Sequence, residues 1–205
     1  MPKSSNLMSA SNNLPAVGNN IPRRGNVISR KLALWGMKLF GWSIHGELPD
    51  ANKFVIIGVP HTSNWDFILV IATATALGIR ISWMAKNTLF RGLAGPIFKW
   101  MGGVAIDRNA PGGVVGDSVS TFNRSEKLIL CITPEGTRGK VTTWKSGFYR
   151  IVQEANIPLL LATFDYGKKE LVLGPVFPIS GDYESDLERI KEHYKGVKAK
   201  HPQLA

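Results

Sequence analysis

Residues 54–66 read FVIIGVPHTSNWD, an apolar run that stops at a proline and gives way to a polar turn. The run Phe54–Val59 has the length and composition of a buried strand. Polar residues follow directly, and the stretch 66–77 then carries the periodicity of a helix. A buried strand, a turn and a helix form the repeating unit of α/β domains. This stretch therefore predicts an α/β fold.

The same alternation continues along the chain after Pro49. Further strands are predicted at 81–85, 104–107, 128–133, 159–163 and 170–176, and further helices at 89–101, 114–123, 144–154 and 183–198. Alternation of this kind is typical of a central, largely parallel sheet flanked by helices. We therefore treat residues 46–205 as a single domain of the α/β class.

The composition is that of one globular domain. With 205 residues, 44% of them hydrophobic, the chain can bury roughly two-thirds of the surface that it exposes when unfolded. Its single cysteine, Cys131, lies in an apolar run, which favours a buried thiol over a reactive one. No run of about 18 apolar residues occurs, so a membrane-spanning helix is not predicted. Any attachment to a membrane is expected at its surface.

The first 26 residues differ from the rest in composition. Half of them are Asn, Ser or Pro, a mixture that buries too little apolar area to offset the entropy of ordering. We expect residues 1–26 to form a flexible tail. A basic, acid-free start is also compatible with an organelle transit peptide, although the amphipathic arginine repeat of such peptides is missing.

Residues 27–45 are predicted to form an amphipathic helix on a membrane surface. On a helical projection, Lys31 and Lys38 share one side with Trp35 and Trp42. The opposite side carries Leu32, Ala33, Met37, Leu39, Phe40 and Ile44. Basic residues beside tryptophans, over an apolar face too short to span a bilayer, are typical of an interfacial helix. Packing of this helix on the protein's own core is the alternative.

The positive charge is concentrated near the N-terminus. The formal net charge is +10, and no acidic residue precedes Glu47. Residues 47–205 carry only +4, from 19 basic and 15 acidic side chains. A basic arm attracts the phosphates of a bilayer or of a nucleic acid. Because the remaining domain is close to neutral, we expect a partner membrane with anionic lipids and no nucleic acid.

The turn 60–66 carries the first candidate site. His61 follows a predicted strand, and ligands of α/β sheets bind at the carboxyl ends of strands. If His61 lies in the turn and Asp66 in the first turn of the helix, the carboxylate can fix the imidazole tautomer and leave the other nitrogen to accept a proton. The alternative is structural, because Ser63 and Asp66 also match a capping box.

The turn 133–138, sequence TPEGTR, carries the second candidate site and again follows a predicted strand. In one interpretation, Arg138 binds a phosphate or carboxylate while Glu135 accepts hydrogen bonds from substrate hydroxyls. In the other, the two side chains form an ion pair that braces a turn at Gly136, since either charge would be costly to bury alone.

A third charged turn ends the stretch 102–108. Arg108 follows one predicted strand and Lys86 another. A surface arginine is the simplest interpretation of Arg108. Three charged turns that all follow strands nevertheless suggest one convergent anion-binding cleft, which Lys86 can join.

Together these turns resemble the ordered motifs of the glycerolipid (phospholipid/glycerol) acyltransferase family. The four blocks are His61-x4-Asp66, Gly103-Val-Ala-Ile-Asp-Arg108, Pro134-Glu-Gly-Thr-Arg138 and Ile157-Pro-Leu-Leu-Leu-Ala162. They occur in the family's order and spacing over residues 54–165. The resemblance implies a fold like that of glycerol-3-phosphate acyltransferase, preceded by the N-terminal interfacial helix.

The resemblance also implies an activity. The family transfers a fatty acyl group from acyl-CoA or acyl-carrier protein to a lipid hydroxyl, without a metal or bound cofactor, and its commonest activity converts 1-acylglycerol 3-phosphate to phosphatidate. By motif matching, His61 would be the general base and Asp66 its partner. The acceptor would be bound by Arg108, Glu135, Gly136, Thr137 and Arg138, with Lys86 or Arg108 on its phosphate.

Some residues depart from the family's usual pattern and leave the acceptor open. Pro60 stands where many members have Asn, and Asn87 and Thr88 follow Lys86 where phosphatidate-forming members often have an acidic residue. Another lysophospholipid or a lyso-aminolipid is therefore a second candidate acceptor, and a non-catalytic lipid-binding protein is a candidate of another class. For the enzyme we expect a peripheral protein on the cytoplasmic face of a membrane.

Overall fold

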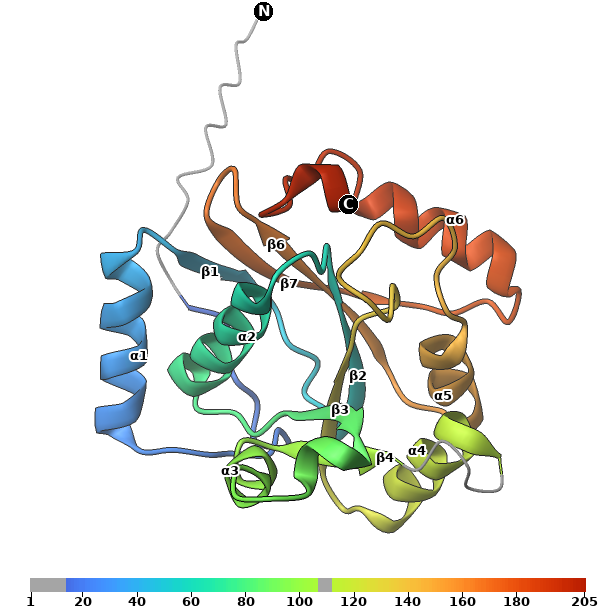
Figure 1. Cartoon of the computed structure of the whole chain (residues 1–205), viewed down its shortest axis with the longest axis horizontal. Helices are drawn as coiled ribbons and strands as arrows, with labels where there is room; N and C mark the ends of the chain where they lie inside the picture. Colours follow the sequence, from blue (N-terminus) through green and yellow to red (C-terminus); the bar gives the residue numbers. More distant parts are fainter. Residues whose placement is uncertain (1–13, 107–111) are drawn as a thin grey trace, which may run out of the picture.

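The computed structural model describes residues 14–106 and 112–205 and shows a sheet between two layers of helices (Figure 1). The strands are β1 (Ser43–Gly46), β2 (Lys53–Val59), β3 (Ser82–Lys86), β4 (Gly103–Ile106), β5 (Leu128–Ile132), β6 (Leu159–Asp165) and β7 (Glu170–Phe177). The helices are α1 (Val27–Leu39), α2 (Asn64–Leu77), α3 (Gly95–Trp100), α4 (Gly113–Arg124), α5 (Gly147–Ala155) and α6 (Tyr183–His193), with short 3-10 turns at Asn87–Phe90 and Pro202–Leu204. The predicted α/β class is confirmed.

The sheet has the strand order β1-β7-β6-β2-β5-β3-β4. From β6 to β4, all neighbouring strands are parallel. Only the hairpin of β6 and β7 is antiparallel, and β1 pairs in parallel with β7. The loops that follow β6, β2, β5, β3 and β4 therefore start from the same edge of the sheet, as expected for the site.

Alternation along β2 supplies the core on both sides of the sheet. Phe54 and Ile56 pack in the cluster that α1 and α2 cover. Val55 and Ile57 pack in the cluster on the other face, which α5 and α6 help to cover. Since β2 is buried on both faces, its sequence is a nearly continuous apolar run, as is typical of a central parallel strand.

The predicted flexible tail of residues 1–26 is wrong for its second half. Residues 14–26 have no helix, but Ile21 is fully buried in the core beside α2. Arg23 forms an isolated antiparallel bridge with Ile79, directly after α2. One buried isoleucine and backbone pairing outweigh the polar composition of this segment. Residues 1–13 lie outside the described residues.

The helix predicted over 27–45 ends at Leu39. Gly41 follows with φ of 77°, a left-handed conformation that stops the helix, and the chain then enters β1. Ile44 is buried because it is a strand residue, not because it continues a helical face.

Two other helices were predicted too long. The stretch 89–101 is interrupted after its 3-10 turn, and α3 begins only at Gly95. The last helix was predicted over 183–198 but ends at His193, followed by Gly196 with φ of 81°. The part of the chain after α6 runs back toward the edge of the sheet where the turn 60–66 lies, and the N–H of His201 there donates to Thr62.

The faces of α1 also differ from the predicted projection. Met37 points into the core, whereas Ile28, Leu32, Trp35 and Leu39 form an outward stripe with exposed fractions of 62–70%. Their spacing of four, three and four residues places them on one helical face. Trp35 therefore joins the exposed leucines and does not oppose them. Lys31 and Lys38 are also exposed and lie together along one side of this stripe on the helical projection.

Candidate active site

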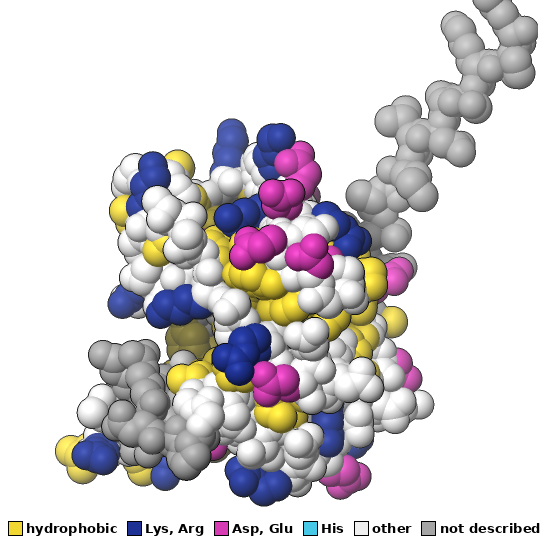
Figure 2. Space-filling view, turned by 90° about the vertical axis from the view of Figure 1, so that its right-hand side faces the viewer, with side chains coloured by type: hydrophobic (Ala, Val, Ile, Leu, Met, Phe, Trp, Pro, Cys, Tyr) yellow, Lys and Arg dark blue, Asp and Glu magenta, His cyan; other side chains and the backbone are white. Residues whose placement is uncertain are grey.

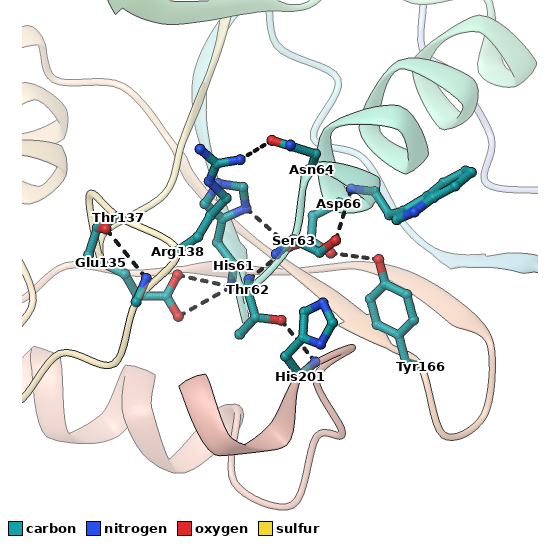
Figure 3. A network of polar contacts seen from close by, with 12 residues as sticks. His61, Thr62, Ser63, Asn64, Asp66, Glu135, Thr137, Arg138, Tyr166 and His201 are labelled. Carbon is teal, nitrogen blue, oxygen red and sulfur yellow. Dashed lines mark hydrogen bonds and ion pairs between the residues drawn. The ribbon is translucent and has the colours of Figure 1, made fainter.

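His61 and Asp66 are brought together by the turn between β2 and α2 (Figure 3). The imidazole Nδ1 lies 3.2 Å from Oδ2 of Asp66. Ser63 is the N-cap of α2, and Asp66 occupies the third helical position. The same carboxylate oxygen accepts the backbone N–H groups of Thr62 and Ser63 at 2.8 Å. The capping box and the histidine pair are thus both present.

Asp66 is held as an anion. It is 1% exposed, and burial alone would raise its pKa. Hydrogen bonds from His61, Tyr166, Ser63 and Thr62 outweigh the burial and hold the pKa of this carboxyl below its ordinary value. With Nδ1 donating to Asp66, the other imidazole nitrogen, Nε2, can accept a proton.

Glu135 braces this turn from the loop after β5. Its carboxylate accepts the backbone N–H of His61, at 3.0 Å and 3.3 Å for its two oxygens. The side chain is buried, so burial raises the pKa of Glu135 to about 7. In this structure the carboxylate binds the backbone of the turn 60–66, and its bonds to substrate hydroxyls stay a prediction.

Arg138 points toward the start of α2. Its Nη1 donates to Oδ1 of Asn64, and the guanidinium is exposed. Gly136 adopts φ of 67°, which makes the sharp turn expected there. Among the described residues, Glu135 and Arg138 form no ion pair with each other, so the bracing pair considered above is not what holds this turn.

Of the remaining predicted site residues, Thr137 and Lys86 lie in the part of the chain that the structure describes. Thr137 is exposed beside Arg138, and its Oγ1 accepts the N–H of Gly139 at 3.4 Å. Lys86 is the last residue of β3, at the same edge of the sheet as His61. Arg108 lies outside the described residues. The structure thus brings the first and third motif blocks together and leaves the second undescribed at its key residue.

A large apolar cavity of about 790 Å³ opens beside His61. Its walls include Ile56, Gly58, Phe67, Val70, Cys131 and Phe164, with Arg138 and Lys145 among its polar residues. Burial raises the pKa of the Cys131 thiol to about 12, so this side chain is a neutral part of the wall. A cavity of this volume and apolar lining fits an alkyl chain.

A second cavity of about 390 Å³ lies next to the turn 60–66. It is lined by Thr62, Ser63, Asn64, Arg138, His201, Gln203 and Leu204. Asn64 and Arg138 line both cavities. Most residues that line the second cavity are polar, whereas the first cavity is mostly apolar. The two cavities adjoin at Asn64 and Arg138.

Sequence reasoning missed three contributions to this region. Tyr166 donates to Oδ1 of Asp66 at 2.6 Å from the β6–β7 hairpin. The N–H of His201 donates to Oγ1 of Thr62 at 3.2 Å. Lys145 lines the apolar cavity from the segment before α5. Tyr166 directly follows β6, but the strand was predicted only to Thr163, so a search for polar residues directly after strands did not point to it.

The side of the molecule that carries α4, α5 and α6 is drawn in Figure 2. Acidic side chains gather in its upper part, at the height of α6, and Lys and Arg side chains lie beside a recess with hydrophobic side chains in it. On this face the acidic side chains are concentrated near α6, whereas Lys and Arg side chains occur from its top to its bottom.

We expect Glu135→Gln to make the protein more stable at pH 8. The ordinary pKa of the group is 4.5, and burial raises it to about 7. The folded state therefore binds a proton more readily than the unfolded state, so stability is full below pH 4.5 and falls as the pH rises through 7. Glutamine keeps an acceptor for the His61 N–H without a charge.

Thermal unfolding of both proteins at pH 5 and pH 8 checks this expectation. The variant should melt a few degrees higher at pH 8, since each kcal/mol shifts Tm by roughly 2–4 °C in a domain of this size. Glu154→Gln, on the surface of α5 and paired with Arg150, is the matched control. If wild type and Glu135→Gln showed the same dependence of Tm on pH, the raised pKa of Glu135 would be contradicted.

Comparison with known proteins identifies the family. The model of the family described as Acyltransferase matches residues 42–164, more than half of the chain. Among solved structures, the 1-acyl-sn-glycerophosphate (LPA) acyltransferase PlsC from Thermotoga maritima superimposes with a TM-score of 0.56 at 16% identity, covering 84% of this chain and 80% of that one. No significant match was found among curated proteins. The matched family and the shared fold confirm the resemblance carried by the four sequence blocks, and the chain belongs to the acyltransferase family.

Proposed function

We propose that this acyltransferase transfers a fatty acyl group from acyl-CoA or acyl-carrier protein to the hydroxyl of a lysophospholipid. The preferred acceptor is 1-acylglycerol 3-phosphate, and the product is then phosphatidate. One observation carries the proposal. The His61–Asp66 pair, with Nδ1 and Oδ2 3.2 Å apart, lines an apolar cavity of about 790 Å³, and Asn64 and Arg138 line both this cavity and a polar one of about 390 Å³.

The chemistry is a direct transfer with His61 as general base. Nε2 of His61 takes the proton of the acceptor hydroxyl as that oxygen attacks the thioester carbonyl. The new carbon–oxygen bond forms, the carbon–sulfur bond breaks, and the imidazolium returns its proton to the departing thiolate. Asp66 holds the tautomer and stabilises the imidazolium during the step. No cofactor takes part in these steps.

The two cavities divide the substrates between them. The apolar cavity holds a fatty acyl chain, whose burial supplies about 0.8 kcal/mol for each methylene group. The polar cavity holds the headgroup of the acceptor, and Arg138 binds its phosphate at the boundary of the two spaces. Binding both substrates in this geometry can lower the barrier by several kcal/mol through orientation alone.

A release assay tests the proposed function. Purified protein is given palmitoyl-CoA or palmitoyl-carrier protein, and free thiol is measured with lysophosphatidate, other lysophospholipids or lyso-ornithine lipid as acceptor. We expect acceptor-dependent thiol release that is fastest with lysophosphatidate. If the reaction were faster with a lyso-aminolipid, that lipid would take the place of lysophosphatidate as the proposed acceptor. Binding of lipid without thiol release from either donor would favour a non-catalytic lipid-binding protein.

We further propose that the outward stripe of α1 attaches the enzyme to a membrane. In the part of the chain that the structure describes, no helix has the length and apolar character needed to cross a bilayer. Leu32, Trp35 and their neighbours in the stripe are exposed, and basic residues accompany them. Apolar insertion combined with positive charge is what stable surface attachment requires. The cytoplasmic leaflet is proposed because acyl-CoA and acyl-carrier protein are cytoplasmic thioesters.

We expect the double substitution Leu32→Ser with Trp35→Ser to lower binding to vesicles at least tenfold. Both side chains are mostly exposed, so the fold loses little packing, whereas insertion of each into lipid contributes about 1.5–3 kcal/mol. Sedimentation with vesicles containing phosphatidylglycerol measures the bound fraction. Val176→Ser, which also removes an exposed apolar side chain, is the control. Unchanged sedimentation of the double variant would place the membrane contact elsewhere.

A further inference from the structure

Tyr166 lies on the opposite side of Asp66 from His61 (Figure 3). It is the first residue after β6, and its hydroxyl donates to Oδ1 of Asp66 at 2.6 Å. The contact joins residues 100 positions apart in the sequence. It exists because β6 pairs with β2 in the sheet, so that the loops after these two strands start side by side.

The two oxygens of Asp66 have different partners. Oδ2 accepts from His61 Nδ1 and from the backbone N–H groups of Thr62 and Ser63. Among the described residues, Tyr166 is the one donor to Oδ1. Asp66 is 1% exposed, so bulk water does not readily replace a lost donor. The hydrogen bond from the Tyr166 phenol therefore satisfies Oδ1 and fixes the orientation of the carboxylate plane of Asp66.

Tyr166 is itself fixed in place from two directions. Its ring meets the ring of Trp42 edge-on, with centroids 5.0 Å apart. Its backbone N–H donates to the carbonyl of Lys198 at 2.8 Å. Burial, together with the hydrogen bond to Asp66, raises the pKa of the phenol, so Tyr166 stays a donor at working pH. A side chain held this firmly can define the position of the group that it contacts.

We propose that Tyr166 is a positioning residue for catalysis and extends the His61–Asp66 pair to a hydrogen-bonded chain of three side chains. The inference rests on the proposed role of His61 as general base. Tyr166 does not reach the substrate. It acts through Asp66, fixing the carboxylate so that Oδ2 stays aligned with Nδ1 of His61, and sharing the negative charge that stabilises the imidazolium.

Loss of the hydroxyl has two consequences of different kind. Without the bond, Oδ1 has lost its donor, and the carboxylate can change its tilt while it stays paired with Nδ1. Nε2 of His61 is then aimed less precisely, which lowers turnover. The charge that remains on Asp66 is less shared, so the imidazolium is stabilised more and the base loses its proton only at higher pH. A purely structural role of Tyr166 predicts neither a change in the shape of the pH profile nor a change at His61.

Other charged groups lie around the pair and are the same in all variants compared below. Glu135 faces the turn from the loop after β5, and the charge of Asp66 contributes to raising its pKa. His201 contacts Thr62 from the C-terminal segment, and Lys200 lies over the ring of Trp65 at 4.6 Å. None of these groups contacts the phenol of Tyr166 among the described hydrogen bonds and ion pairs.

The test compares Tyr166→Phe with Tyr149→Phe. Tyr149 also donates its hydroxyl to a buried aspartate, Asp186, at 2.9 Å, but on α5, where it lines neither cavity. For Tyr166→Phe we expect kcat to fall about tenfold to a hundredfold, the size of one charge-assisted hydrogen bond. We also expect the acidic limb of the pH profile of kcat/KM to move to higher pH. Tyr149→Phe should lower Tm without changing either quantity.

A second measurement, the ¹⁵N NMR signals of the His61 imidazole, tests the inference without an activity assay. In protein with ¹⁵N-labelled histidine, the imidazole signals of His61 should change in Tyr166→Phe and stay the same in Tyr149→Phe. If Tyr166→Phe does not fold, 3-fluorotyrosine at position 166, a stronger donor of nearly the same shape, should move the acidic limb of the pH profile to lower pH.

If wild type transfers no acyl group to any acceptor, the proposed function fails. If Tyr166→Phe keeps the wild-type pH profile and wild-type His61 signals, the inference fails.

Discussion

His61→Ala should lower kcat for acyl transfer by a factor of about 10² to 10⁴, the range that a positioned general base supplies. The fold should survive, because the turn is held through groups that alanine retains. Glu135 binds the backbone N–H of residue 61, and the carboxylate of Asp66 accepts the N–H groups of Thr62 and Ser63. The loss should therefore appear in kcat, with little change in Tm or in binding of the acyl donor.

Thiol release from palmitoyl-CoA, with the acceptor in excess, measures this effect. His45→Ala is the matched control, because His45 lies on β1, where its Nε2 contacts only the neighbouring Ser43 among the described side chains. We expect the control to keep wild-type turnover. Near-wild-type turnover in His61→Ala would show that another group takes the proton.

Arg138→Ala should lower kcat/KM for lysophosphatidate about a hundredfold. A guanidinium that binds phosphate through two parallel hydrogen bonds contributes about 1.5–3 kcal/mol, and Arg138 lies where the two cavities adjoin. Arg138→Lys should recover only part of the loss, since an ammonium keeps the charge but not the paired donors. Lys140→Ala, two residues further along the same exposed loop, is the control.

The same set of variants identifies the headgroup. An acceptor without a phosphate, such as monoacylglycerol, should react equally with wild type and Arg138→Ala. If Arg138→Ala lost the same factor with both acceptors, Arg138 would act on the shared part of the reaction, or on the turn through Asn64, and not on the phosphate. Measuring KM and kcat separately distinguishes these cases, because loss of headgroup binding raises KM first.

Sequence reasoning reached the parts of the site that are local. His61 and Asp66 lie within one strand–turn–helix unit, and their meeting follows from the capping geometry of a single turn. Glu135 and Arg138 could be placed near them because both turns follow strands. Their partners could not be predicted, since the pattern does not show whether Glu135 turns toward Arg138, toward substrate or toward a backbone N–H.

Long-range contacts account for what was missed. Tyr166 meets Asp66 only because β6 is a neighbour of β2, and strand order is not visible in periodicity. The predicted strand also stopped at Thr163, two residues before its observed end. Likewise, His201 reaches Thr62 across 139 residues. At the N-terminus, the helical pattern continues past Gly41, and only the left-handed backbone there separates α1 from β1.

The double use of Asp66 has a consequence for how this enzyme can be altered. Functional groups often weaken the fold that carries them, so that stabilising substitutions reduce activity and the reverse. Here one carboxylate both caps α2 and orients the imidazole. Selection for a well-formed helix start and selection for a well-aligned base therefore favour the same aspartate in the same rotamer. If His61 is the proposed base, thermostability and turnover can improve together at this position, so variants selected for heat resistance should keep the turn 60–66 unchanged.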